Sequence, residues 1–273
     1  MQRPPTHLWR TIMFGRNKEN PAVKAANGTL FDKDGNPKPG ILRGIERALD
    51  VQRPLILANL NRLRRRNPDA SPAELARLLE RDYLRATTAA GAAVGATAAV
   101  PAVGTIASLG LSAAATVGFL EATALYAESV AELHGINTQD PVRSRTMVMA
   151  ILMGEEGTAL IRSILGASAG QGAPQYWGQL VNKSAPTSLV KTVTGSIQRR
   201  FLKKFLAKQG GFMLGRALPF GAGAIIGGTG NHLMGKAVIR TTREAFGPLP
   251  QTIPGELAEV LQLPEQGSGR KRA

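Results

Sequence analysis

The chain has 273 residues and a formal net charge of +15, with 34 Lys and Arg residues against 19 Asp and Glu residues. It contains no cysteine, which excludes disulfide bonds, thiolate catalysis and cysteine-ligated zinc. Hydrophobic residues make up 43% of the chain, enough for a sizeable core, and the basic excess favours anionic partners, either nucleic acid or anionic lipid.

Residues 1–40 are predicted to form a loosely structured N-terminal segment, because prolines and turn dipeptides interrupt them repeatedly. No apolar run of signal-peptide length occurs there. We therefore expect a protein of the cytoplasm, or of the cytoplasmic face of a membrane, that is not secreted. The run from Asp32 to Asn36 resembles a calcium loop, but its glycine comes too early, and we interpret it as a turn.

The next segments have the pattern of helices. Residues 41–66 are expected to form a basic helical region with a bend at Pro54. Ser71, Pro72 and Glu74 then mark a helix start, with a serine N-cap, a proline in the first turn and a glutamate that completes a capping box. The basic region ends in a cluster that is a candidate for contact with an anionic surface: Arg64, Arg65 and Arg66.

The most distinctive feature of the sequence is the stretch of residues 86–120, which carries no charged side chain. Pro101 and Gly104 divide it into two pieces, and a membrane-spanning helix needs about 20 apolar residues. The first piece is too short, whereas the second could span once. We predict a tightly packed helical hairpin instead, buried in the protein or dipping into one leaflet. Two glycines at GxxxG spacing permit close helix approach: Gly91 and Gly95.

The helix that follows carries glutamates on about one face and is expected to end near His134, with Gly135 just after its cap. One interpretation of this group is a carboxylate-and-histidine metal site. A solvated acidic face is the interpretation that we favour, because the segment has no Glu-x-x-His pair. The candidate ligands are Glu121, Glu128, Glu132 and His134.

Asp140 marks the start of another helix, and Glu155 with Glu156 is expected to form a polar bend in it. After a glycine- and proline-rich connection over 166–186, residues 187–209 are predicted to form a basic amphipathic helix. Its apolar stripe suits a protein core or a membrane surface, and we favour the core. Its basic side is a second candidate for anionic-surface contact: Arg199, Arg200, Lys203, Lys204 and Lys208.

A second uncharged, glycine-rich block covers residues 217–235. It has neither the preceding strand nor the G-K-[ST] ending of a nucleotide-binding loop. We predict that the two uncharged blocks pack on each other as helices of small residues. The glycines assigned to this packing are Gly91, Gly95, Gly104, Gly223, Gly227 and Gly228.

Several stretches resemble the EcsC family of bacterial proteins, above all the block from Pro219 to Asn231 and the segment around Pro101. The resemblance covers about residues 60–250 and implies a helical, membrane-associated protein. Because the family takes its name from a gene beside an ABC-transporter operon, a transport-related membrane-protein partner is also implied. The resemblance implies no catalytic residue and no cofactor. The signature positions are Pro101, Glu121, His134, Gly135, Pro219 and Asn231.

We therefore predict an all-α fold, a multi-helix bundle with closely packed Ala- and Gly-rich central helices. It comprises the segment 1–40, a helical domain over 41–250, and a short helix with a basic tail over 251–273. The expected function is non-enzymatic attachment to an anionic membrane, without a cofactor. Two alternatives stay open: a soluble nucleic-acid-binding protein, and a metal-dependent enzyme that uses the Glu/His group above with Glu155, Glu156 or His232.

Overall fold

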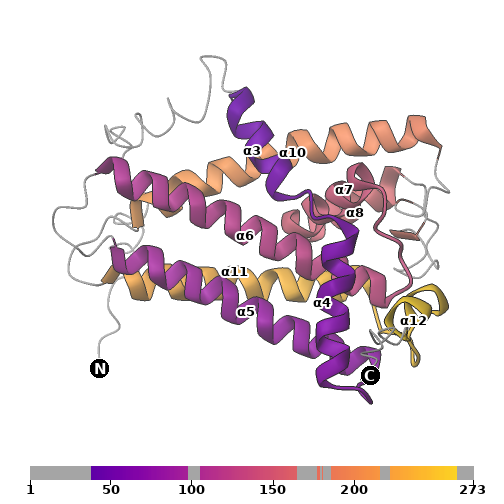
Figure 1. Cartoon of the computed structure of the whole chain (residues 1–273). Helices are drawn as coiled ribbons and strands as arrows, with labels where there is room; N and C mark the ends of the chain where they lie inside the picture. Colours follow the sequence, from indigo (N-terminus) through magenta and orange to yellow (C-terminus); the bar gives the residue numbers. More distant parts are fainter. Residues whose placement is uncertain are drawn as a thin grey trace, which may run out of the picture.

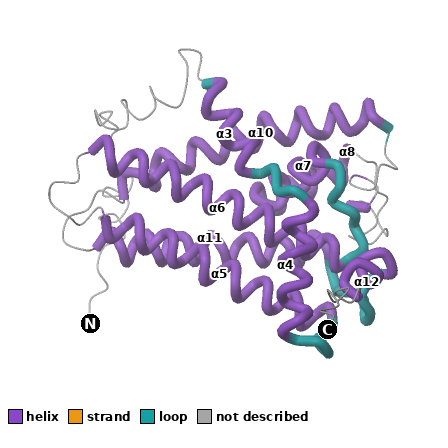
Figure 2. Tube along the Cα trace, in the orientation of Figure 1, coloured by secondary structure: helices purple, strands orange, loops and turns teal. Residues whose placement is uncertain are grey.

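A computed structural model describes residues 38–97, 105–164, 177–178, 180, 186–215 and 222–262. In these parts the chain consists of helices joined by loops, as Figure 2 shows, which confirms the all-α prediction. The predictions for residues 1–37 and 263–273 fall outside the described residues. The helices are α3 (Pro39–Ala48), α4 (Arg53–Arg66), α5 (Pro72–Thr97), α6 (Thr105–Leu133), α7 (Pro141–Met153), α8 (Glu155–Ile164), α10 (Thr187–Gly215), α11 (Ala222–Phe246) and α12 (Gly255–Gln262).

Four long helices, α5, α6, α10 and α11, run lengthwise through the molecule (Figure 1). The most extensive contact joins α5 to α11, and α6 packs against α5. On the other side, α10 packs on α7, which also contacts α6, α8 and α11. The shorter helices α3 and α4 lie against α6. The result is a bundle in which small-residue helices form one pair, α5 and α11.

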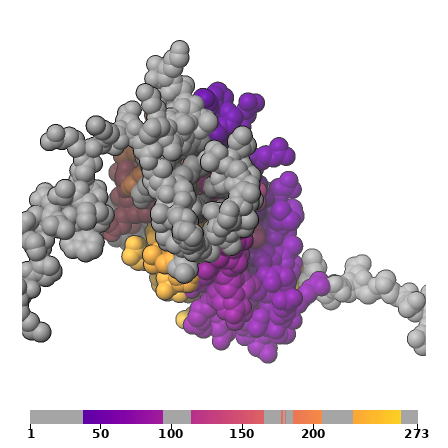
Figure 3. All heavy atoms as spheres, turned by 90° about the vertical axis from the view of Figure 1, so that its left-hand side faces the viewer, coloured from indigo at the N-terminus to yellow at the C-terminus, as the bar shows by residue number. Residues whose placement is uncertain are grey.

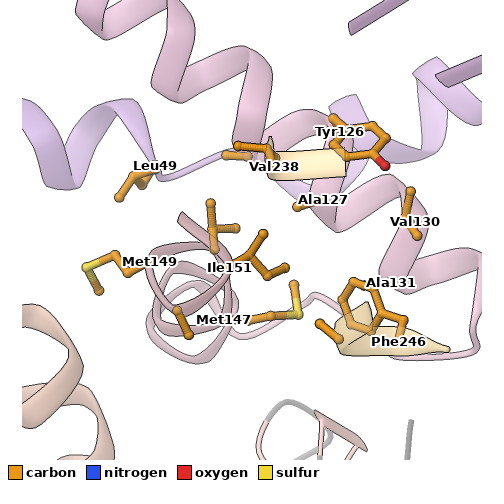
Figure 4. Packing of buried hydrophobic residues seen from close by; sticks show 14 of the residues in the cluster. Leu49, Tyr126, Ala127, Val130, Ala131, Met147, Met149, Ile151, Val238 and Phe246 are labelled. Carbon is orange, nitrogen blue, oxygen red and sulfur yellow. The ribbon is translucent and has the colours of Figure 1, made fainter. Parts of the chain in front are cut away.

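The hydrophobic core lies where α6, α7 and α11 meet (Figure 4). Val130 of α6, Ile151 of α7 and Val238 and Phe246 of α11 are all buried there. Full burial of one such side chain stabilises the fold by roughly 1.5–3 kcal/mol. This shared core fixes α7 beneath α10 and beside α11.

Glycines set how closely α5 and α11 approach. A Cβ atom added at Gly228 would lie 3.4 Å from the Cβ of Ala92, and one added at Gly235 would lie 2.9 Å from Cδ2 of Leu84. A methyl group at Gly228 would make ordinary van der Waals contact, whereas one at Gly235 would require the Leu84 side chain to move, so the close approach of the two helices depends on small residues along this pair. Gly91, on the α5 side, is buried.

Local helix-end signals behave as the sequence predicts. The backbone N–H of Ser71 donates to Oε2 of Glu74 (2.8 Å), and the N–H of Glu74 donates to Oγ of Ser71 (3.3 Å), which completes the capping box. Asp140 accepts hydrogen bonds from the two backbone N–H groups that open α7. At the end of α6, Gly135 has φ 75°, a left-handed conformation that favours glycine.

The bend predicted at Pro54 is wrong. α3 ends at Ala48 and α4 begins at Arg53, so residues 41–66 contribute to two separate helices. Pro54 lies in the first turn of α4, where a backbone N–H group has no acceptor within the helix. The N–H that proline lacks therefore costs the helix no hydrogen bond. The proline therefore helps to start a helix and does not kink one. The polar bend predicted at Glu155 and Glu156 is present, since α7 ends at Met153 and α8 begins at Glu155.

Candidate functional site

The long helices bring their uncharged segments to one end of the bundle, on the left of Figure 1. Figure 3 turns this side toward the viewer. Blocks that are far apart in the sequence are thereby neighbours, because α5 packs along α11. We call this region the uncharged end. It is formed by residues 86–97 of α5, 105–120 of α6, 209–215 of α10 and 222–235 of α11.

The boundary of the uncharged end is mostly basic. Counted along each helix from the uncharged end, the first charged residue is Arg85 on α5, Lys208 on α10 and Lys236 on α11. On α6 it is Glu121. Arg85, Glu121 and Lys236 are exposed. The two exposed cations, Arg85 and Lys236, favour contact with anionic groups.

Apolar side chains are exposed within the uncharged end. Leu233 on α11 is 61% exposed and Val117 on α6 is 38% exposed, while Ala89 and Ala93 of α5 are exposed as well. At about 1.5 Å per residue, the uncharged segments of α5, α6 and α11 are roughly 18, 24 and 21 Å long. Among the described residues, no helix combines the length and the apolar character needed to cross a membrane.

The two basic clusters predicted to contact an anionic surface lie apart. Figure 1 shows α10 along the top of the molecule and the C-terminal end of α4 at the bottom. In the α4 cluster, Nη1 of Arg64 donates to the backbone oxygen of Ala70 (2.7 Å). In the α10 cluster, Nζ of Lys204 lies 2.5 Å from Oε2 of Glu156. The exposed members of the two clusters are Arg65, Arg66, Arg199, Arg200 and Lys203.

The apolar stripe of α10 faces the protein. Val193, Ile197, Phe201 and Phe205 are buried, as the core interpretation of this amphipathic helix expects. The buried part of the stripe packs toward α7, whereas Leu189 near the start of the helix is 39% exposed, and the basic residues Arg199, Arg200 and Lys203 are exposed as well. The exposure of Lys208 lies outside what the structure describes.

Asn231, the last residue of the signature block, and its neighbour His232 join α11 to α5. Nδ2 of the buried Asn231 donates to the backbone oxygen of Thr87 (3.1 Å). Nδ1 of His232 lies 3.1 Å from Oγ1 of Thr88. Both contacts are between helices, so they add to the close packing of this pair. Of the other predicted positions, Pro101, Gly104 and Pro219 lie outside the described residues, as does the burial of Gly95, Gly223 and Gly227.

The glutamates of α6 do not form a solvated acidic face, so that prediction is wrong. Glu121 is exposed, but Glu128 and Glu132 are only 1% and 3% exposed. Glu132 is held by Arg53 of α4, whose Nε donates to Oε1 over 2.8 Å, and by the hydroxyl of Thr138 (2.8 Å). This clamp ties the start of α4 to the end of α6.

Glu128 lies one turn before the clamp on the same helix. Neither carboxylate oxygen has a hydrogen-bond partner in the part of the chain that the structure describes. Burial raises the pKa of Glu128 well above its ordinary value, and the nearby carboxylates of Asp50 and Glu132 raise it further. The fold therefore favours the protonated, neutral form of this side chain.

The metal-site interpretation of these residues has no geometric support. Glu132 is engaged by Arg53, and the ring of His134 stacks on Phe246 with centroids 5.3 Å apart. Burial lowers the pKa of His134 to about 4. Within the described residues, no group of three or more His, Asp or Glu side chains is arranged to hold a metal ion.

We expect the variant Glu128→Gln to remove a pH dependence from folding stability. Because the folded-state pKa of Glu128 is raised, the contribution of this group to wild-type stability is fully present below about pH 4.5 and is lost as the pH rises through the folded pKa. The slope reaches up to about 1.4 kcal/mol per pH unit. The glutamine amide introduced there does not titrate, so urea unfolding between about pH 4.5 and 8 should show the variant gaining relative stability with pH.

The exposed Glu121 on the same helix supplies the matched control. Glu121→Gln should leave the pH dependence of unfolding as in the wild type. A constant stability difference between Glu128→Gln and the wild type across the pH range would show that Glu128 is not held neutral.

Comparison of the chain with models of protein families, with curated proteins and with solved structures finds no match. The resemblance to the EcsC family stays a prediction from the sequence. The function is therefore argued from the geometry of the uncharged end.

Proposed function

We propose that the protein is a non-enzymatic attachment protein whose uncharged end enters one leaflet of an anionic membrane on its cytoplasmic face. The observation that carries this proposal is the gathering of the charge-free segments of α5, α6 and α11 at one end, above a mostly basic boundary. The proposal also includes the resemblance to EcsC proteins and a transport-related membrane partner. Both are consistent with attachment to a membrane.

The dimensions suit insertion into one leaflet. A bilayer core is about 30 Å thick, so one leaflet is about half of that. The uncharged segments are roughly 18–24 Å long, which places their boundary residues at the headgroup level. Each basic residue near an anionic surface contributes about 1 kcal/mol. Arg85 and Lys236 are exposed at this level, with Lys203 about a turn and a half from the boundary residue of α10.

Vesicle flotation tests the proposal. We expect the purified chain to float with vesicles that contain phosphatidylglycerol, and to float less when salt shortens the Debye length from about 10 Å toward 3 Å. The variant Leu233→Asp puts a charge in the uncharged end at an exposed position. Leu233 is about 4.5 Å along the helix from the boundary residue Lys236, so the charge costs less there than at the bilayer centre, but the variant also loses the burial of a leucine side chain, worth roughly 1.5–3 kcal/mol. Binding should therefore fall at least about tenfold, since 1.4 kcal/mol is a factor of ten.

Leu55→Asp is the matched control, because Leu55 on α4 is also 61% exposed and lies outside the uncharged end. It should float like the wild type. The proposal fails if the wild-type chain stays unbound with anionic vesicles at low salt, or if Leu55→Asp and Leu233→Asp weaken flotation equally.

A further inference from the structure

A pocket lies between α10 and α11, over the end of α7. Its volume is about 370 Å³. Both α10 and α11 pack on α7, whereas the described parts of α10 and α11 make few contacts with each other. The pocket therefore lies between α10 and α11, and the end of α7 forms its floor.

The pocket has a mainly apolar wall. Phe119 comes from α6, Ile151 from α7, Phe201 and Phe205 from α10, and Met234 from α11. The rings of Phe201 and Phe205 stack with centroids 5.0 Å apart, so they form a continuous aromatic side. Flexible methionine and flat aromatic surfaces adapt to a hydrocarbon chain.

The charged side chains that line the pocket are basic. Lys204 and Arg240 line it, and the described lining residues include no carboxylate. Their acidic partners face elsewhere: Glu156, which pairs with Lys204 at 2.5 Å, and Glu244, which lies 3.9 Å from Arg240, both line a separate groove along α8. An anionic group at the pocket therefore meets two cations, one of which, Lys204, is also paired with Glu156.

We propose that this pocket binds a fatty acid, with its acyl chain against the phenylalanines and its carboxylate beside Lys204 and Arg240. At roughly 30 Å³ for each water-sized group, the volume holds about a dozen groups, which matches one medium-length chain and excludes two. A pocket of this size is at the lower end of the range for small-molecule sites. The inference does not rest on membrane attachment, because a dissolved fatty acid enters the pocket without a bilayer.

Calorimetric titration of the full chain with dodecanoate, below the concentration at which micelles form and without vesicles, tests this proposal. We expect saturable binding at one site. Dodecyltrimethylammonium, with the same chain and a cationic head, should bind at least tenfold more weakly. The double variant Lys204→Gln, Arg240→Gln should also weaken dodecanoate binding at least tenfold.

A variant with a large side chain in the pocket provides a second test of the proposal. Ala237 is an exposed residue of the lining, so Ala237→Trp places an indole there and should weaken dodecanoate binding at least tenfold. Ala86→Trp, at an exposed alanine of α5 outside the pocket, should leave it unchanged. Leu233→Asp should also leave it unchanged, which separates this site from vesicle binding. Unsaturable binding, equal binding of the cationic amphiphile, or undiminished binding to Ala237→Trp would overturn the proposal.

Discussion

Replacing Glu132 by alanine is expected to lower the free energy of unfolding by about 3 kcal/mol, the lower end of the range for breaking a buried ion pair. Glu132 is 3% exposed and accepts hydrogen bonds from the guanidinium of Arg53 and from the backbone N–H and hydroxyl of Thr138. The variant leaves Arg53, itself 17% exposed, without its principal carboxylate. Urea unfolding monitored by circular dichroism measures the loss.

The matched control is Glu121→Ala on the same helix, which should change stability by no more than about 0.5 kcal/mol because Glu121 is exposed. A double-mutant cycle with Arg53→Ala isolates the pair, and we expect a coupling of about 1–3 kcal/mol. A loss below about 1 kcal/mol for Glu132→Ala would show that the clamp does not hold α4 on α6.

Gly157→Ala is expected to destabilise the fold by about 3 kcal/mol, at the upper end of the usual cost of overpacking. A Cβ atom at Gly157 would lie 2.2 Å from the backbone oxygen of Ala150 and 2.8 Å from its carbonyl carbon. These are backbone atoms of α7, so no side-chain rotation relieves the clash. The corner between α7 and α8 must open instead. A shift of the urea midpoint measures the effect.

Gly195→Ala is the control for this substitution. Gly195 lies within α10, and a Cβ atom added there has no atom within 4 Å outside its own helix. Alanine at such a position should stabilise the chain by about 0.4–1 kcal/mol, because it restricts the unfolded state. Equal effects of the two variants would contradict the close packing of α8 on α7.

Features that depend on neighbouring residues were predictable from the sequence. The capping box of Ser71 and Glu74 and the N-cap of Asp140 use hydrogen bonds that reach two or three residues along the chain. The left-handed glycine at the end of α6 is equally local. The position of Pro54 shows the limit of this reasoning, because a proline inside a helical pattern can either bend a helix or begin one.

Features that depend on distant residues were not predictable. The burial of Glu132 requires Arg53, which lies 79 residues away in the sequence, and periodicity alone gave no sign of that partner. Trp177 lies within the predicted glycine- and proline-rich connection over 166–186, yet its Nε1 donates to the backbone oxygen of Ala245 over 2.7 Å. The pocket arises from four separate helices. Composition did indicate the uncharged blocks, but their meeting at one end follows from the topology of the bundle.

The absence of cysteine makes the depth of the uncharged end directly measurable with single labels. Ala93 and Ala73 are both exposed residues of α5, near opposite ends of the helix and about 30 Å apart at 1.5 Å per residue. Ala93→Cys and Ala73→Cys can each carry an environment-sensitive nitrobenzoxadiazole fluorophore without altering the buried contacts of the bundle.

With phosphatidylglycerol vesicles, the label at position 93 should shift its emission to shorter wavelength and be quenched by nitroxides on the acyl chains. The label at position 73 should keep its aqueous spectrum. If neither label responds to the vesicles, or if the label at position 73 responds as strongly as the label at position 93, the uncharged end does not enter the leaflet.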